Sequence, residues 1–399
     1  MSTQTTINPN LILKATETDL YEEFIDETFW DALAVDSALE QGEGGVAPDS
    51  VMTRKTEKLT IGAKYIEFGV TLQLDGEGIF EGGTLSGAEE PIETNDNAVH
   101  FTTARHGVPF PLKELEAHYQ EAFNLLQKRQ RLLAIWNGRL AEQWHWQSFM
   151  KACPDQVNTD LGTASPQSWH PNIYTLDSTT GVTKVVWSAT DATYQTNIDT
   201  AITAQASGDN VSAEQFWRME VVMADLQIRK IPISIDGSSE GLWLWVYPRA
   251  SRVRIRVALK DFFLQGDVRG PNNRALKGDK FKFGNFLFCE SAHIPRVKET
   301  GAGTVSLEES WAYDATVNKR KDNRATSKGL MHALLGADSL CLAEPEMVQY
   351  DFERKDYKAK EGIGTYRLFG SRRGESFDDR NNVTAVLNQS SVAVIEYNG

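Results

Sequence analysis

The sequence predicts an α+β protein built from two unusually long elements and a mixed body. Residues 64–74 alternate apolar and polar side chains, as in a half-buried strand about 36 Å long. Residues 112–150 contain no proline and repeat apolar side chains every three or four positions, as in a helix of about 60 Å. Residues 180–300 mix helical segments with short apolar strands. Elements this long need a large neighbour to cover them, and we expect another copy of the chain to be that neighbour.

Composition excludes several classes of protein. The chain has 399 residues, 41% hydrophobic and 24% charged, which predicts a soluble protein of two or three sub-domains. No apolar run approaches the roughly 18 residues of a membrane span, and the N-terminus lacks the features of a secretory signal. Three cysteines, at 153, 289 and 341, are far apart, and we expect free thiols in a reducing compartment.

Charge is distributed unevenly along the chain. The net charge of −14 argues against nucleic-acid binding as the main activity, which needs clustered Lys and Arg. Residues 1–50 hold eleven acids and one lysine, a net of −10, whereas residues 249–298 hold twelve Lys or Arg against four acids, a net of +8. This asymmetry suggests that the acidic segment of one copy docks on the basic surface of another. The alternative is two independent solvated faces.

The N-terminal part of the chain is predicted to form an arm followed by a hairpin. Within residues 1–50, residues 20–39 have helical spacing of apolar side chains. Residues 51–108 form the predicted hairpin, with a glycine-rich tip at 75–91 that suits a projecting loop. Its return strand is expected to stop at Pro109.

The long helix is predicted to lie across a surface. Its main apolar stripe has polar residues on both sides, which indicates that only one face is covered. The stripe consists of Leu112, Leu115, Tyr119, Ala122, Leu126, Leu133, Trp136, Leu140 and Trp144.

The body is predicted to contain helices and strands. Helices are expected at 190–206 and 212–228, the second with a capping-box spacing from Ser212 to Gln215. A short helix is expected near 326–337. Strands are expected at 231–235, 242–247, 280–289, 364–369 and 390–397.

Residues 250–265 are ambiguous. Apolar side chains alternate with Arg252, Arg254 and Arg256, which indicates a strand carrying an arginine ladder for carboxylates or phosphates. The alternative is that the arginines form a solvated strand face that protects a sheet edge. The stretch ALKDFFLQ that follows has the spacing of a helix instead.

Sequence patterns for catalysis, cofactors and metals are weak. The glycine pattern at 76–82 has Glu in place of its last glycine, so it is no dinucleotide fingerprint. No two of the seven histidines have i, i+3 or i, i+4 spacing. The aromatic run 144–146 suits packing better than a sugar platform. The acid pairs 89–90 and 378–379 suit solvated loops better than general acid–base catalysis. We expect no enzyme, cofactor or metal site.

Six stretches between residues 55 and 399 carry a family resemblance. They are LDGEGIFEGGTLSGAEEP, LLAIWNGRLAEQW, VYPRASRVRIRVALKDFFLQ, NRALKGDKFKFGNFLFCESAHIP, ALLGADSLCLAE and FDDRNNVTAVLNQSSVAVIEY. Together with the order of arm, long hairpin, long helix and mixed body, they resemble a podovirus-associated family of major capsid proteins of tailed bacteriophages. These are loose patterns of moderate specificity.

The resemblance implies the tailed-phage major capsid fold. That fold has an N-terminal arm, an extended β-hairpin (E-loop) that reaches over neighbouring subunits, a peripheral domain with a long spine helix, and an axial domain. It also implies a helix at 250–265. The implied division is an arm at 1–50, the E-loop at 51–108, the peripheral domain with the spine helix at 109–180, the axial domain with returns to the peripheral domain at 181–375, and C-terminal strands of the peripheral domain at 376–399.

The implied function is structural. Such a subunit self-assembles into the hexamers and pentamers of an icosahedral head that encloses double-stranded DNA, within the virion and after assembly in the host cytoplasm. Implied partners are further copies, with scaffolding, portal and cement proteins as candidates. The acidic chain would contact DNA weakly. Candidate intersubunit contacts are Glu22, Glu23, Asp26, Glu27, Asp75, Glu77, Glu81, Arg252, Arg254 and Arg256.

Two other functions remain open. The ten tryptophans are compatible with a phage tail or surface-attachment protein that binds glycans. The paired carboxylates are compatible with a glycoside hydrolase. The hairpin tip contains no lysine, so we carry over no isopeptide cross-link from relatives that have one. The acidic segment begins near Met1, so we expect no proteolytic removal of an N-terminal scaffolding segment. The sequence leaves open whether the arm docks in cis or in trans.

Overall fold

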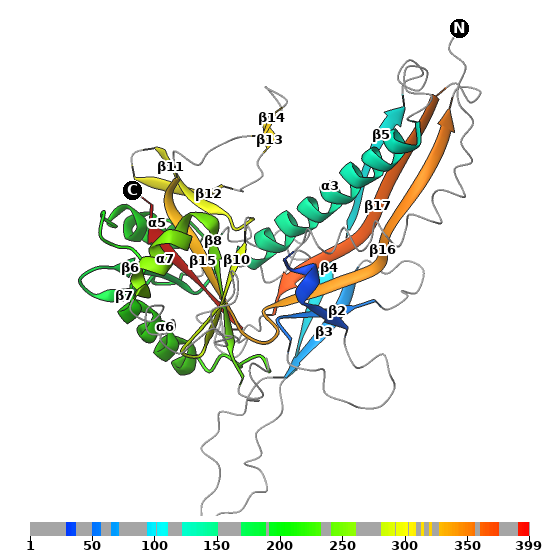
Figure 1. Cartoon of the computed structure of the whole chain (residues 1–399). Helices are drawn as coiled ribbons and strands as arrows, with labels where there is room; N and C mark the ends of the chain where they lie inside the picture. Colours follow the sequence, from blue (N-terminus) through cyan, green and yellow to red (C-terminus); the bar gives the residue numbers. More distant parts are fainter. Residues whose placement is uncertain are drawn as a thin grey trace, which may run out of the picture.

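The structure is a computed structural model in which two β-sheets share one core (Figure 1). A nine-stranded sheet with helices on both faces forms one body, and a long five-stranded sheet with a helix along it projects from that body. The structure describes residues 29–36, 50–56, 65–71, 94–100, 102–110, 122–150, 169–188, 191–232, 241–260, 281–291, 293–301, 303–308, 313–314, 319–320, 327–355, 360–374 and 390–398.

The nine-stranded sheet is built around three apolar strands buried on both faces. They are β8 (Trp243–Pro248), β15 (Ser327–Leu335) and β18 (Ser391–Tyr397), and β15 pairs antiparallel with the other two. Continuous apolar runs of this kind are typical of strands covered on both faces. The remaining strands are β6 (Ile173–Asp177), β7 (Gly181–Lys184), β9 (Phe281–Phe283), β10 (Phe286–Ser291), β11 (Arg296–Gly301) and β12 (Thr304–Glu308).

Helices cover the two faces of this sheet. Trp243 and Trp245 face a cluster with α6 (Ala213–Asp225) and α7 (Arg252–Ala258). Alternate residues of β8 face the other cluster, which contains Tyr194 and Ile198 of α5 (Asp191–Thr203). The expected capping box is confirmed, because Ser212 and Gln215 exchange side-chain and backbone hydrogen bonds at the start of α6.

The second sheet carries the long helix. Its order is β1 (Ala34–Asp36), β2 (Met52–Lys55), β16 (Leu340–Lys355), β17 (Lys360–Arg373) and β5 (Thr102–Phe110). Helix α3 (Ala122–Met150) lies along this sheet, mainly against β17 (Figure 1). Its 29 residues span about 43 Å. The helix prediction is confirmed for residues 122–150, and its first ten residues lie outside the described part. Pro109 lies within β5, at a sheet edge where the missing N–H is tolerated.

The buried stripe of α3 differs from the predicted one. Trp136, Leu140 and Trp144 are only half-buried, whereas Glu142 and His145 are fully buried. The prediction used apolar side chains alone and therefore chose a neighbouring stripe. Polar residues can occupy the buried face of the helix when they find hydrogen-bond or ionic partners on the sheet.

The two sheets are joined at a tight crossing. The chain passes from β15 to β16 through residues 336–339, and the core there is continuous from Trp30 to Ile395. A Cβ at Gly336 would lie 2.4 Å from Cγ2 of Ile228, so only glycine fits this approach.

Several expected elements differ from the structure. Residues 327–335 form β15 rather than a helix, because strands pair with both of its edges and a core cluster buries each of its faces. Within the expected helix 20–39, residues 31–36 form a 3-10 turn (Asp31–Leu33) and strand β1. The family resemblance implied that residues 376–399 belong with the domain of the long helix, whereas β18 pairs inside the nine-stranded sheet. The expected strands at 242–247, 280–289, 364–369 and 390–397 coincide largely with β-strands. Of the strand expected at 231–235, Ile231 forms an isolated bridge, and 233–235 lie outside the described part.

Candidate assembly surfaces

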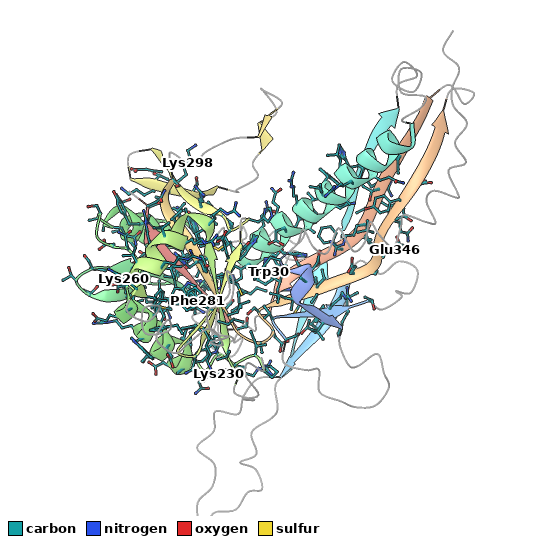
Figure 2. All side chains as sticks on the ribbon, viewed as in Figure 1. Trp30, Lys230, Lys260, Phe281, Lys298 and Glu346 are labelled. Carbon is teal, nitrogen blue, oxygen red and sulfur yellow. The ribbon has the colours of Figure 1, made fainter. Side chains whose placement is uncertain are left out.

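A short N-terminal segment is anchored between the two sheets by Trp30. This side chain is fully buried and packs edge-on against Trp146 of α3, with ring centroids 5.0 Å apart. Figure 2 shows Trp30 at the junction where α3 meets the body. Glu142, one turn before Trp146, accepts hydrogen bonds from the backbone N–H groups of Phe29 (3.0 Å) and Trp30 (3.2 Å). The segment is therefore held by both packing and hydrogen bonds.

A buried ion network extends this anchor to β17. Arg367 donates to both carboxylate oxygens of Asp31, at 3.1 and 3.2 Å, and its Nε donates to Glu344 at 2.7 Å. His145 Nε2 lies 3.4 Å from Asp31, and Arg54 Nη1 lies 3.8 Å from Glu344. The network thus joins the N-terminal segment, β2, α3, β16 and β17. Paired charges can be buried at this depth because each carboxylate has a cationic partner.

The two acids of the anchor shift in opposite directions. Burial raises the pKa of Glu142 to about 8, and the negative charge of Asp31 adds to the rise. Burial alone would raise the pKa of Asp31 as well, but the Arg367 guanidinium outweighs it and holds that pKa well below its usual range. The anchor therefore combines Glu142, whose pKa is raised by burial, with Asp31, whose pKa is lowered by its cationic neighbours.

The raised pKa of Glu142 predicts that the free energy of unfolding depends on pH. The folded protein keeps this proton up to about pH 8, whereas the unfolded chain releases it near 4.5. Between these values the folded state binds more protons, so the free energy of unfolding falls as pH rises, by at most about 1.4 kcal/mol per pH unit. Urea unfolding of the unassembled subunit from pH 5 to 8 measures this slope. Glu142→Gln should flatten it, whereas Glu214→Gln, at an exposed carboxylate of α6, should not. An unchanged slope in Glu142→Gln would contradict this assignment.

The base of the predicted hairpin is covered by the chain's own sheet. Strand β3 (Tyr65–Thr71) pairs with β4 (Thr94–His100). The alternation is confirmed at Ile66 and Phe68, which are buried with Val99 against Cys341 and Ala343 of β16. The expectation that another copy must cover this hairpin is thus wrong for its base. The tip, with Asp75, Glu77 and Glu81, lies outside the described residues.

The predicted arginine ladder is absent, because the three arginines lie on helix α7. A helix separates alternate residues onto different faces. Arg252 lies 3.4 Å from Glu290. Arg254 donates to Glu396 at 3.2 Å and to the backbone oxygen of Tyr397 at 2.6 Å. Arg256 is exposed. The helix that the family resemblance implied is confirmed for residues 252–258, and the strand interpretation is wrong there. Glu22, Glu23, Asp26 and Glu27 lie outside the described residues.

One buried cluster has the composition of a hydrolase triad but a different geometry. Ser251 donates to Glu396 at 2.5 Å, and His332 Nε2 lies 2.9 Å from Glu396. Trp245 Nε1 donates to His332 Nδ1 at 3.1 Å, so the ring proton sits on Nε2 and points at the carboxylate. His332 therefore cannot take the Ser251 proton, as a triad requires. Burial would raise the pKa of Glu396, but His332, Ser251 and Arg254 together lower it. The cluster holds β18 in place.

No group of three or more His, Cys, Asp or Glu residues arranged for metal binding occurs among the described residues. No described helix is long and apolar enough to cross a membrane. Cys289 and Cys341 are buried free thiols, and burial raises the pKa of Cys341 to about 12. Trp144 and Trp146 pack against Phe369 and Phe149, which confirms their interpretation as packing residues.

Sequence reasoning missed the anchor itself. Arg367 and Asp31 are 336 positions apart, so no local pattern links them. One available signal was the spacing of Glu142 and His145 on a helix whose neighbouring positions are apolar. Two polar residues three apart on such a face indicate buried partners.

Comparison with known proteins identifies solved structures with this architecture. No family model and no curated protein sequence matches the chain. Solved structures do match: the capsid of Ralstonia phage GP4 has 15% identity, covers 88% of each chain and has a TM-score of 0.56. The capsid of Helicobacter pylori bacteriophage KHP30 has 10% identity, covers 92% of this chain and 90% of that chain, and also scores 0.56. The capsid asymmetric unit of cyanophage Pam1 has 14% identity, covers 88% and 89%, and scores 0.52.

The fold of the chain follows from these matches. They cover 88–92% of this chain. The chain therefore has the fold of major capsid proteins of tailed bacteriophages.

Proposed function

We propose that this chain is the major capsid subunit of a tailed bacteriophage, which self-assembles into hexamers and pentamers of an icosahedral head around double-stranded DNA. The observation that carries the proposal is the match to phage capsid structures over 88–92% of the chain. The glycan-binding attachment protein and the glycoside hydrolase are not favoured by this fold.

The sub-domain roles follow the fold. We assign the anchored segment to the end of the arm, β3 and β4 to the base of the E-loop, and α3 with the five-stranded sheet to the peripheral domain. The nine-stranded sheet then forms the axial domain, and it includes β18. This assignment moves the C-terminal strand from the peripheral to the axial domain, in agreement with its pairing to β15 and β6.

The proposed mechanism is assembly, in which many modest contacts close a lattice. Each copy would present the same surfaces to its neighbours, and closure multiplies weak pairwise affinities. Scaffolding, portal and cement proteins are candidate partners, and assembly would take place in the host cytoplasm. The net charge of −14 suits a container that holds DNA without gripping it. Tight binding of duplex DNA by purified shells at physiological salt would contradict this last point.

The function is tested by expressing the full chain alone and with candidate scaffolding proteins. We expect shells, capsomers or curved sheets in negative-stain micrographs, and sedimentation species of about five or six times the subunit mass of 44.6 kDa. Phe68→Asp, in the buried base of the hairpin, should reduce these assemblies, whereas Val186→Asp, at an exposed loop position, should affect the fold little. Monomers or trimers alone, at high concentration and under every condition, would contradict a capsid role and favour the attachment protein.

A further inference from the structure

Strand β12 lies at an edge of the nine-stranded sheet. Within the described residues it pairs with β11 and with no other strand. An edge strand presents unpaired backbone N–H and C=O groups, which are a template for a strand of another molecule. The sequence of β12, TVSLE, has β-branched and apolar side chains and no charge before Glu308, and this composition favours such pairing.

Val305, inside β12, directs its backbone groups away from β11. In an antiparallel pair, alternate residues direct both backbone groups toward the partner strand, and the residues between them direct both groups away. Val305 lies opposite Glu299 of β11, but its N–H and C=O bond to side chains of α5 instead. A further strand that joined β12 would therefore have to pair with Val305.

Two side chains of α5 occupy this position. The Val305 N–H donates to Oδ1 of Asp199 at 2.8 Å, and Nε2 of Gln195 donates to the Val305 oxygen at 2.9 Å. A neighbouring strand would supply the same pair, one acceptor for the N–H and one donor for the C=O. Gln195 and Asp199 are four residues apart on the helix, so they lie side by side, and a hydrogen bond of 2.8 Å joins them.

The core holds these side chains in position. Nε1 of Trp169, which is only 1% exposed, donates to Oε1 of Gln195 at 2.7 Å. Because this bond occupies the Gln195 oxygen, the amide nitrogen is directed at Asp199 and Val305. Ile198 of the same helix is buried in the core cluster that also contains Trp169 and Val305. The contact is therefore built into the core and is not an isolated surface hydrogen bond.

We propose that Gln195 and Asp199 act as a substitute strand, which closes the edge of β12 against the same edge of a second copy. Without them, β12 of two copies would form an antiparallel two-fold pair and extend the sheet across the contact. Such a pair would compete with the contacts that close a lattice. This role rests on the proposed capsid function, in which many copies meet and must join through other surfaces.

Substitution of Asp199 in the full chain tests the closed edge. Asp199→Ala removes the acceptor of the Val305 N–H. In dilute protein we expect the slowest amide of residues 303–308 to exchange with solvent about tenfold faster than in the unmodified chain, as measured by mass spectrometry. At higher concentration the exchange should slow again, and sedimentation should show a species of twice the subunit mass of 44.6 kDa. Both effects are expected because β12 of a second copy replaces the missing side chain.

Three further variants separate the closed edge from a loss of stability in α5. Asp199→Asn keeps the Oδ1 acceptor, so its exchange and sedimentation should match those of the unmodified chain. Thr200→Ala removes an exposed hydroxyl that bonds the Thr196 oxygen within the helix, and it should also change neither measurement. Gln195→Ala frees the Val305 oxygen and should produce the same dimer as Asp199→Ala. Circular dichroism of each variant checks that the subunit is folded.

The outcomes are separable from those of the capsid proposal. Exchange in Asp199→Ala that stays fast at every concentration, with no dimer, would overturn the closed edge, because the edge then attracts no second strand. Unchanged exchange in Asp199→Ala, or equal dimer formation in Asp199→Asn, would overturn it as well. Failure of the unmodified chain to form any shell or capsomer would overturn the capsid function, whereas the dimer of Asp199→Ala would still support the closed edge.

Discussion

Replacing Arg367 by methionine is expected to lower the free energy of unfolding by about 3–5 kcal/mol, because it leaves two buried carboxylates without their shared cation. Arg367 is nearly fully buried and contacts both Asp31 and Glu344. Methionine keeps the apolar stem of the side chain and removes the guanidinium, so the loss combines the unpaired carboxylates with the space that this group leaves. Urea unfolding of the unassembled subunit at pH 7 measures the change.

The matched control is Arg218→Met on α6. Arg218 also pairs with a carboxylate, Glu214, but this pair is exposed and within one helix. Its removal should cost about 0.5 kcal/mol or less. Equal losses for the two variants would show that the buried network contributes no more than a surface ion pair.

The second large effect is expected from Trp30→Ala. Trp30 is completely buried between Phe29, Trp146 and Phe149. Truncation of such a side chain costs about 3–5 kcal/mol. The change should detach the anchored segment, so shells or capsomers should also become fewer. Thermal unfolding and sedimentation of the same preparations measure the two effects.

Two further variants test whether the stability lost in Trp30→Ala comes from packing. The Trp30 Nε1 atom has no hydrogen-bond partner among the described residues, so Trp30→Phe removes no polar contact seen there and should cost clearly less than Trp30→Ala. Trp217→Ala, at a half-exposed position of α6, should be close to neutral. If Trp30→Ala were as mild as Trp217→Ala, the segment would not be anchored by its tryptophan.

Part of the candidate site could be predicted from sequence. The alternation at residues 64–74 located the buried side of the hairpin at Ile66 and Phe68, because a strand's period of two is a property of the chain itself. The opposite charges of residues 1–50 and 249–298 predict a contact between copies that the structure does not test.

The different partners of the three arginines of α7 could not be predicted from sequence in the same way. Arg252, Arg254 and Arg256 look equivalent in sequence, but the helix turns them in different directions. Two of them contact Glu290 and Glu396, which are 38 and 142 positions away from their partners. Contacts at such separations depend on the packing of whole sheets, which local patterns do not encode.

By itself the sequence determined the elements whose pattern is local: the strand at Trp243–Pro248, the capping box at Ser212, and the helix that ends at Met150. The tertiary structure decided the rest. It made Ser327–Leu335 a strand, because β8 and β18 pair with its two edges and the core clusters on both sides of the sheet bury its two faces. It also turned Asp31 into an anchor, because only the folded chain brings a carboxylate near the N-terminus against an arginine near the other end.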